Sequence, residues 1–300
     1  MYKFVLKLIL FSIFLCKIIA QVPNGRAFGW IDFPSTEEKL VYPMNIFFSD
    51  NNYSLKVEIE ESDIPFSVEE SSMLINSGYS YYIEEGTYNI EDNGGIKFFH
   101  TDKESILDNT LILYSKLSII FIKNNNLIFM SQYLGNANEA RPFITSVSES
   151  SFLKEGNVEY KGQNVDLVQK AINEAYIPWV ENAEEYGIGE SITVRFSGFI
   201  PLRGFLLSNG YVSYERPDLY LKNSRIKKIR IENSVGVSKE FDLEDSSNLQ
   251  YLDFYNEYRE DFEFEEIYTF TILDVYPGTE WSDTCLNMII PTSKINMGLK

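Results

Sequence analysis

The chain has 300 residues, of which 44% are hydrophobic and 15% aromatic, so it is long enough to bury a core and to form two domains. Its formal net charge of −18 disfavours nucleic acid and anionic lipid as partners, because neutralising phosphates requires clustered Lys and Arg. Its single histidine, His100, excludes a multi-histidine metal centre and weakens the case for histidine-based nucleophilic catalysis.

The first 20 residues have the pattern of a signal peptide. Two lysines precede an apolar stretch that ends near Ala20, a small residue suited to cleavage. The stretch is too short to span a bilayer of about 30 Å. We therefore expect an exported mature chain, periplasmic or extracellular, without a transmembrane segment. Cys16 leaves lipoprotein anchoring as an alternative, although the bulky Leu15 before it departs from the usual lipoprotein signal.

Residues 21–138 are predicted to form a β-rich domain of unknown function, an antiparallel meander or barrel-like sheet. Leu55, Val57 and Ile59 alternate with charged residues, which is the period-2 pattern of a half-buried strand. The DNGG sequence at 92–95 indicates a hairpin, because Asn and Gly tolerate positive φ. The GNAN sequence at 135–138 is typical of a linker.

The second half begins near Phe143 and is predicted to be a β-sandwich or jelly roll, which makes the whole chain all-β. Many short strand patterns with spaced turns are typical of that architecture. They fall at 144–147, 191–196, 204–207, 227–231, 240–243, 251–254 and 267–276. A short helix is expected at Val165–Asn173, where apolar residues recur with helical spacing.

Groups suited to catalysis are scarce. His100 ends a strand pattern, which indicates a structural or surface histidine. Cys285 has no candidate histidine partner in its own half, and the apolar residues after it indicate a small buried side chain. The acidic residues between 253 and 266 and the basic residues between 222 and 230 are typical of solvated faces. We therefore expect neither enzymatic activity nor a cofactor.

Six short motifs in the second half resemble, in order and spacing, the NAD glycohydrolase translocation factor V/VIII type C domain, a discoidin-like and galactose-binding-like family. The motifs are WVE at 179–181, YGIGE at 186–190, NGY at 209–211, YLKNSR at 220–225, DVYPGTE at 274–280 and DTC at 283–285. The resemblance covers about residues 143–291. It implies a jelly-roll sandwich that binds glycans through loops at one end and serves binding and delivery beside a toxin's NAD-cleaving domain. The cleavage chemistry belongs to that neighbouring domain and is not carried over.

Many discoidin-like modules hold a structural calcium ion, which takes 6–8 hard oxygen ligands. Their usual Asp-Gly-Asp loop is replaced here by NEAY at 173–176, and Met288 stands where an acidic residue is usual. Two ligand positions have therefore lost charge or oxygen, and we expect this calcium site to be absent or weak.

Residues of the types that bind sugars lie in or beside the predicted loops, because aromatic faces stack on C–H surfaces and planar polar groups bind hydroxyls. The candidate ligand-binding residues are Trp179, Glu181, Tyr211, Asn223, Arg225, Tyr276 and Asp283. Structural roles are open for several: Trp179 as a core residue, Asn223 as a turn residue, and Glu181 with Arg225 as a buried ion pair. Tyr211 and Asp283 follow turn residues and are expected to project outward.

The sequence thus predicts an exported, non-catalytic binding protein that recognises a glycan or a glycosylated surface. One alternative is protein–protein adhesion, which a flat aromatic loop set would favour over a concave polar pocket. The other is an uncharacterised hydrolase in the N-terminal domain with the sandwich as its targeting module. That alternative requires a deep cleft containing two carboxylates about 5–10 Å apart.

Overall fold

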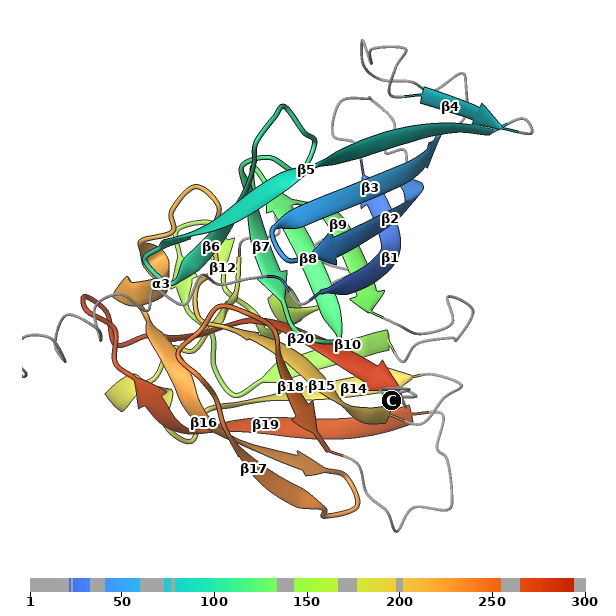
Figure 1. Cartoon of the computed structure of the whole chain (residues 1–300). Helices are drawn as coiled ribbons and strands as arrows, with labels where there is room; N and C mark the ends of the chain where they lie inside the picture. The colour runs from blue at the N-terminus through green and yellow to red at the C-terminus, as the bar shows by residue number, and fades with distance from the viewer. Residues whose placement is uncertain are drawn as a thin grey trace, which may run out of the picture.

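The computed structural model describes residues 22, 24–32, 41–59, 73–76, 79–133, 143–166, 177–197, 202–254 and 265–293. Within these ranges nearly every regular element is a strand, and the strands form two large sheets and one small hairpin (Figure 1). The expected all-β fold is confirmed. The expected signal segment, the linker at 135–138 and most of the expected helix, 167–173, lie outside the described residues.

The N-terminal sheet is an antiparallel meander that closes on itself. Its strands are β1 (Gly25–Asp32), β2 (Val41–Ser49), β3 (Asn52–Ile59), β4 (Met73–Asn76), β5 (Tyr79–Asn93), β6 (Ile96–Thr101), β7 (Thr110–Tyr114), β8 (Ser118–Lys123) and β9 (Asn126–Tyr133). The order is β3-β2-β1-β9-β8-β7-β6-β5-β4, and β3 also pairs with β5. The long β5 closes the sheet because its residues up to Thr87 pair with β3 and those from Tyr88 onward pair with β6.

The predicted period-2 pattern and the predicted hairpin both occur in this sheet. Leu55 and Val57 are fully buried in the core that the sheet encloses, and Phe48, Phe99 and Phe121 lie in the same core. The hairpin joins β5 to β6 through glycines at 94 and 95, whose φ angles are +63° and +90°. Alternation in a strand therefore sets which face is enclosed.

The C-terminal half is a β-sandwich whose two layers share one short seam. Its strands are β10 (Phe143–Glu149), β11 (Lys154–Glu155), β12 (Val158–Glu159), β13 (Trp179–Val180), β14 (Ser191–Ser197), β15 (Leu202–Asn209), β16 (Ser224–Asn233), β17 (Ser238–Asp242), β18 (Gln250–Asp253), β19 (Glu265–Tyr276) and β20 (Thr284–Ser293). One layer is β10-β14-β19-β16 with β17 beside β16, and the other is β20-β15-β18 with β13 beside β20. The seam is a two-residue parallel pairing of β16 with β20.

The helical elements are short. In the described ranges they are the 3-10 turns η3 (Gly162–Val165) and η4 (Glu185–Gly187) and the α-helical turn α3 (Leu219–Lys222). Of the expected helix only Val165 and Asp166 are described: Val165 is the last residue of η3, and Asp166 is extended and forms an isolated bridge with Ile289. Among the described residues, no helix has the length and apolar character needed to span a membrane.

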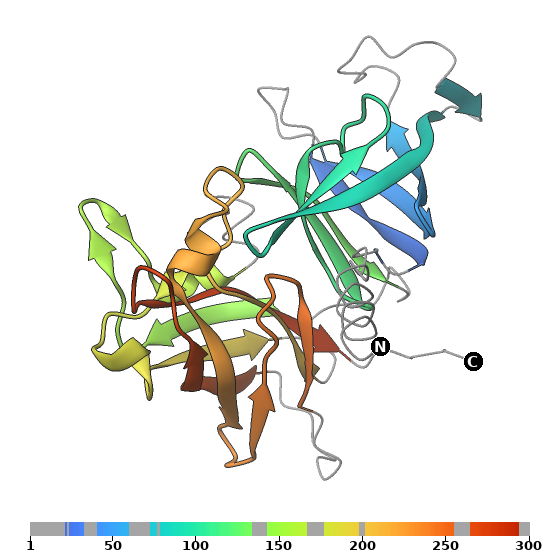
Figure 2. The same ribbon diagram turned by 60° about the vertical axis from the view of Figure 1, so that its left-hand side comes forward.

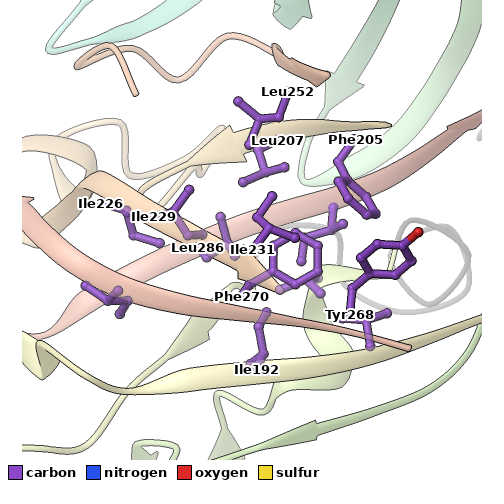
Figure 3. Packing of buried hydrophobic residues seen from close by; sticks show 14 of the residues in the cluster. Ile192, Phe205, Leu207, Ile226, Ile229, Ile231, Leu252, Tyr268, Phe270 and Leu286 are labelled. Atoms are coloured by element: carbon purple, nitrogen blue, oxygen red, sulfur yellow. The ribbon is translucent and has the colours of Figure 1, made fainter. Parts of the chain in front are cut away.

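The sandwich core lies between the two layers. Ile192, Ile231 and Phe270 of the first layer face Phe205 and Leu286 of the second, and all are at most 1% exposed (Figure 3). The strand patterns read at 191–196, 227–231 and 267–276 correspond to β14, β16 and β19. Their alternation supplies one inward face per strand.

A further apolar cluster joins the two halves of the chain. It contains Ile96, Phe98, Leu111, Leu113, Ile120 and Ile122 of β6–β8 and Leu206, Val212, Tyr220, Leu249, Met288 and Ile290 of the sandwich. In Figures 1 and 2 the β5–β6 hairpin lies beside α3, and the hydroxyl of Ser247 donates to the carbonyl of Gly95 at 2.8 Å. Strands β15 and β20 therefore present apolar side chains on both faces, one to the sandwich core and one to the N-terminal sheet.

Candidate functional site: the loop end of the sandwich

Several segments meet at one end of the sandwich, and we call residues 153–160, 181–190, 210–223 and 277–283 the loop end. Strands β14, β16 and β20 begin there, and β15 and β19 end there, because of their mainly antiparallel pairing. The β11–β12 hairpin joins them through the Leu153 N–H, which donates to the carbonyl of Val180 at 2.8 Å. The candidate ligand-binding residues all lie in or next to this end.

Several of the candidates are core residues rather than surface residues. Trp179 is 1% exposed, and its indole N–H donates to the carbonyl of Ser151 at 2.9 Å. The amide of Asn223 donates to the carbonyl of Leu219 at 2.9 Å, as its turn interpretation expects. The expectation that Tyr211 projects outward is wrong, because Tyr211 is 8% exposed and packs with Val180 and Cys285.

Glu181 and Arg225 do not form the ion pair that was left open as a structural role, because each has other partners. The carboxylate of Glu181 is fully buried and accepts the backbone N–H groups of Ala183 at 2.6 Å and Thr284 at 2.8 Å. Burial raises the pKa of Glu181. A Cβ at Gly187 would lie 2.3 Å from the Glu181 carboxyl carbon, so only glycine lets the 181–190 loop close over this carboxylate.

Arg225 is 5% exposed and fixes three loops. Its guanidinium pairs with Asp245 of the segment between β17 and β18. Its Nη1 also donates to the carbonyl of Asn223 at 3.0 Å and to that of Pro277 at 3.1 Å. The role of Arg225 is to position loop backbone.

Tyr276 and Asp283 keep partial exposure. The Tyr276 hydroxyl donates to the carbonyl of Leu243 at 3.0 Å, which ties β19 to the end of β17. The side chain of Asp283 is half-buried, and this burial raises its pKa. Of the charged candidate residues, Asp283 is partly exposed, whereas Glu181 and Arg225 are buried.

Exposed apolar side chains at the loop end escaped the sequence analysis. They are Val158 at 38%, Tyr186 at 38%, Ile188 at 56%, Leu221 at 39% and Trp281 at 36% exposure. Tyr186 has φ of +65°, the left-handed conformation that residues other than glycine rarely adopt. The sequence does contain a signal for Trp281 as a surface residue, because this aromatic residue follows the Pro-Gly turn at 277–278.

The backbone under Trp281 is rigidly held. The N–H of Trp281 donates to the carbonyl of Lys222 at 2.9 Å, and that of Gly278 donates to the hydroxyl of Ser224 at 2.9 Å. A Cβ at Gly278 would lie 2.3 Å from the carbonyl oxygens of both Lys222 and Trp281, so the two loops approach as closely as backbone allows. The exposed indole therefore projects from a fixed position.

Charged groups surround this indole. The Lys222 ammonium lies 5.4 Å from the centre of the Trp281 ring and forms ion pairs with Glu280 at 3.0 Å and Asp218 at 3.3 Å. Arg216 also pairs with Asp218 and, with Lys222, lowers the pKa of Asp218 to about 2. The arrangement offers an aromatic face with hydrogen-bond donors and acceptors at its rim.

The two residues considered for catalysis lie in different halves of the chain. Cys285 on β20 is fully buried, as expected, and burial raises the pKa of its thiol well above the ordinary value. His100 on β6 is partly exposed, with its Nε2 3.6 Å from a Glu91 oxygen and its Nδ1 3.9 Å from an Asp108 oxygen.

No group of three or more His, Cys, Asp or Glu side chains with metal-binding geometry occurs among the described residues. The NEAY loop lies outside them, and Met288 is buried in the cluster between the halves.

Residues 140–290 match the family described as the NAD glycohydrolase translocation F5/8 type C domain. The chain belongs to this family. It therefore carries a discoidin-like module of a binding or translocation-associated kind, and the fold described above is consistent with that membership. No curated protein and no solved structure matches the chain. The matched segment contains the loop end in full, whereas the N-terminal sheet lies outside it.

Proposed function

We propose that this chain is an exported, non-catalytic binding protein that recognises glycans through the loop end, with Trp281 as the stacking surface. The observation that carries the proposal is the exposed Trp281 indole on a backbone fixed by Lys222 and Ser224. Aromatic rings bind the C–H faces of sugars, and a fixed ring loses little conformational entropy on binding. Lys222, Glu280 and the half-buried Asp283 supply polar groups for hydroxyls.

Family membership supports a binding role without naming the ligand. The net charge of −18 favours neutral partners over anionic ones. A single shallow site of this kind binds weakly, so we expect useful affinity to arise when several copies meet a surface that carries many glycans.

A glycan array with the full chain displayed multivalently tests the proposal. We expect Trp281→Ala to reduce binding to the recognised glycans about tenfold, the loss of roughly 1.4 kcal/mol. The matched control is Val235→Ala, because Val235 is 58% exposed on the β16–β17 turn at the opposite end of the sandwich. A folded protein that binds no glycan, or equal binding by Trp281→Ala, would contradict the proposal. Release of shortened sugars from bound oligosaccharides would contradict its non-catalytic part.

The second candidate function is binding of a protein partner, and the exposure of Ile188 favours it. Ile188 is 56% exposed beside Tyr186, and an aliphatic side chain offers nothing to sugar hydroxyls. Binding of the chain to cells that survives glycosidase treatment and is lost in Ile188→Asp would select the protein partner. Binding that is abolished by the glycosidase and by Trp281→Ala would select the glycan.

A further inference from the structure

An open hollow of about 420 Å³ lies on the N-terminal sheet, outside the segment that matches the family. It is formed by β2, β3 and β5 with Asp102 from the end of β6. Its volume falls within the range of about 300–1,000 Å³ that small-molecule sites occupy. It therefore has room for a ligand of small-molecule size.

The sheet register sets the composition of the hollow. Phe47, Ser54 and Glu85 stand opposite one another across β2, β3 and β5. Ser49 and Asn52 belong to the next row of the same face. Since side chains alternate along a strand, this face is opposite to the one that buries Phe48 and Leu55. Hydroxyls, an amide and a carboxylate thus converge beside an aromatic ring that is 46% exposed.

Tyr53, which also lines the hollow, is held from the enclosed side of the sheet before any ligand binds. The ring of Tyr53 is 2% exposed, and its hydroxyl donates to the buried carboxylate of Glu84, which also accepts the Tyr82 hydroxyl at 2.5 Å. A Cβ at Gly86 would lie 3.0 Å from the Tyr53 ring and 2.6 Å from a carboxylate oxygen of Asp102. Only glycine therefore leaves the carboxylate and the ring where they are.

The carboxylate of Asp102 is also held in place. An oxygen of Asp102 accepts the backbone N–H of Thr87 at 2.9 Å, and this hydrogen bond lowers the pKa of Asp102. Asp102 and Glu85 place two carboxylates at the hollow, and Lys103 lies close to Asp102. The two carboxylates accept hydrogen bonds from hydroxyls and repel negatively charged ligands.

We propose that this hollow is a second ligand site of the chain, which binds one neutral pyranose sugar with its C–H face on Phe47 and its hydroxyls on Glu85 and Asp102. An exposed aromatic ring combined with convergent carboxylate, hydroxyl and amide groups has the chemistry of a neutral sugar site. Acidic sugars are rejected, because their carboxylates would meet those of Glu85 and Asp102.

Calorimetric titration of the full chain with glucose, galactose, mannose, N-acetylglucosamine and glucuronate tests this site. We expect at least one neutral sugar to bind, glucuronate not to bind, and Phe47→Ala and Glu85→Gln each to weaken binding about tenfold. Glu91→Gln is the matched control, since Glu91 lies on the same strand and face as Glu85 but outside the hollow. Phe47 and Glu85 are both solvent-exposed, so these variants are expected to fold.

Trp281→Ala separates this site from the loop end. Neutral-sugar binding that persists in Trp281→Ala and is lost in Phe47→Ala supports the hollow, whatever the glycan array shows for the loop end. The proposal is overturned if no neutral sugar binds, if glucuronate or a simple amine such as methylamine binds better, or if binding depends on Trp281 and not on Phe47.

Discussion

The guanidinium of Arg225 binds the carboxylate of Asp245 through two hydrogen bonds, Nε to Oδ1 at 3.0 Å and Nη2 to Oδ2 at 2.7 Å. The remaining nitrogen, Nη1, bonds the carbonyls of Asn223 and Pro277. One planar group thus joins the segment after β17 to two segments of the loop end. A lysine at this position could reach the carboxylate but could not reproduce the forked geometry.

Arg225→Lys is therefore expected to destabilise the protein by about 2 kcal/mol, because the carbonyls of Asn223 and Pro277 lose their donor while the pair with the 36% exposed Asp245 is only weakened. Urea unfolding measures this change. Arg195→Lys is the control, because the pair that Arg195 forms with Glu265 has side chains 42% and 59% exposed and is worth about 1 kcal/mol or less. Equal losses in the two variants would contradict the positioning role of Arg225.

The burial of Glu181 leads us to expect a specific dependence of stability on pH. Burial raises the pKa of Glu181 above its ordinary value of 4.5, so the folded state holds the proton more tightly than the unfolded state does. The contribution of Glu181 is therefore fully present below pH 4.5 and is lost as pH rises through the raised pKa. In Glu181→Gln, unfolding free energies measured across this window should decrease less than in the wild type, with the remaining decrease coming from Asp283, whose pKa is also raised.

The same substitution also replaces an acceptor of one backbone N–H by an amide, which we expect to cost about 1–3 kcal/mol at low pH. Glu240→Gln serves as the control. Lys228 lowers the pKa of Glu240, so Glu240 contributes in the opposite direction, and its removal should leave the decrease with rising pH in place. The same change of unfolding free energy with pH in the wild type and in Glu181→Gln would disprove the assignment to Glu181.

Gly95→Ala tests the contact between the halves. A Cβ at Gly95 would lie 2.4 Å from the Tyr220 ring, whereas one at Gly236 would meet nothing within 4 Å. Their φ angles are +90° and +86°, so both alanine variants carry similar backbone strain of about 1–2 kcal/mol. We expect Gly95→Ala to lower the thermal midpoint clearly more than Gly236→Ala does. Equal midpoints would mean that Tyr220 does not pack against the hairpin.

Gly278→Ala tests whether binding requires the fixed position of Trp281. Its Cβ would push the Lys222 and Trp281 carbonyls apart, so glycan binding should fall about tenfold although the indole is retained. Gly156→Ala, in the β11–β12 turn of the loop end, has open space around its Cβ and is the control. Undiminished binding by Gly278→Ala would show that the rigidity of this loop is irrelevant.

The sequence patterns predicted the fold class well because alternation in strands such as β3, β14 and β19 is a local signal. Strand β20 was missed for the same reason. Leu286 and Ile289 face the sandwich core while Met288 and Ile290 face the N-terminal sheet, so the strand has no polar face and no alternation. Burial of both faces depends on a contact between distant segments, which a local pattern does not contain.

The candidate residues lie together at one end of the sandwich, as expected, but the direction of their side chains was not predicted. The motifs located the loop end correctly, since turns and strand ends determine which segments meet there. They did not indicate that Tyr211 and Arg225 point inward, because the direction of a side chain in a loop depends on partners such as Cys285 and Asp245. Trp281 lies outward because its backbone is fixed by Lys222, a contact between two segments far apart in the sequence.

The double-faced strands β15 and β20 limit how the family-matched segment could be transplanted. If the family-matched segment were transferred alone into another chain, Leu206, Met288 and Ile290 would become exposed as a contiguous apolar patch. Patches of this kind promote aggregation. A transferred segment that stays soluble has to include β6–β8, whose side chains cover this patch. In this chain the segment that matches the family is thus shorter than the segment that could be transferred to another protein without exposing apolar side chains.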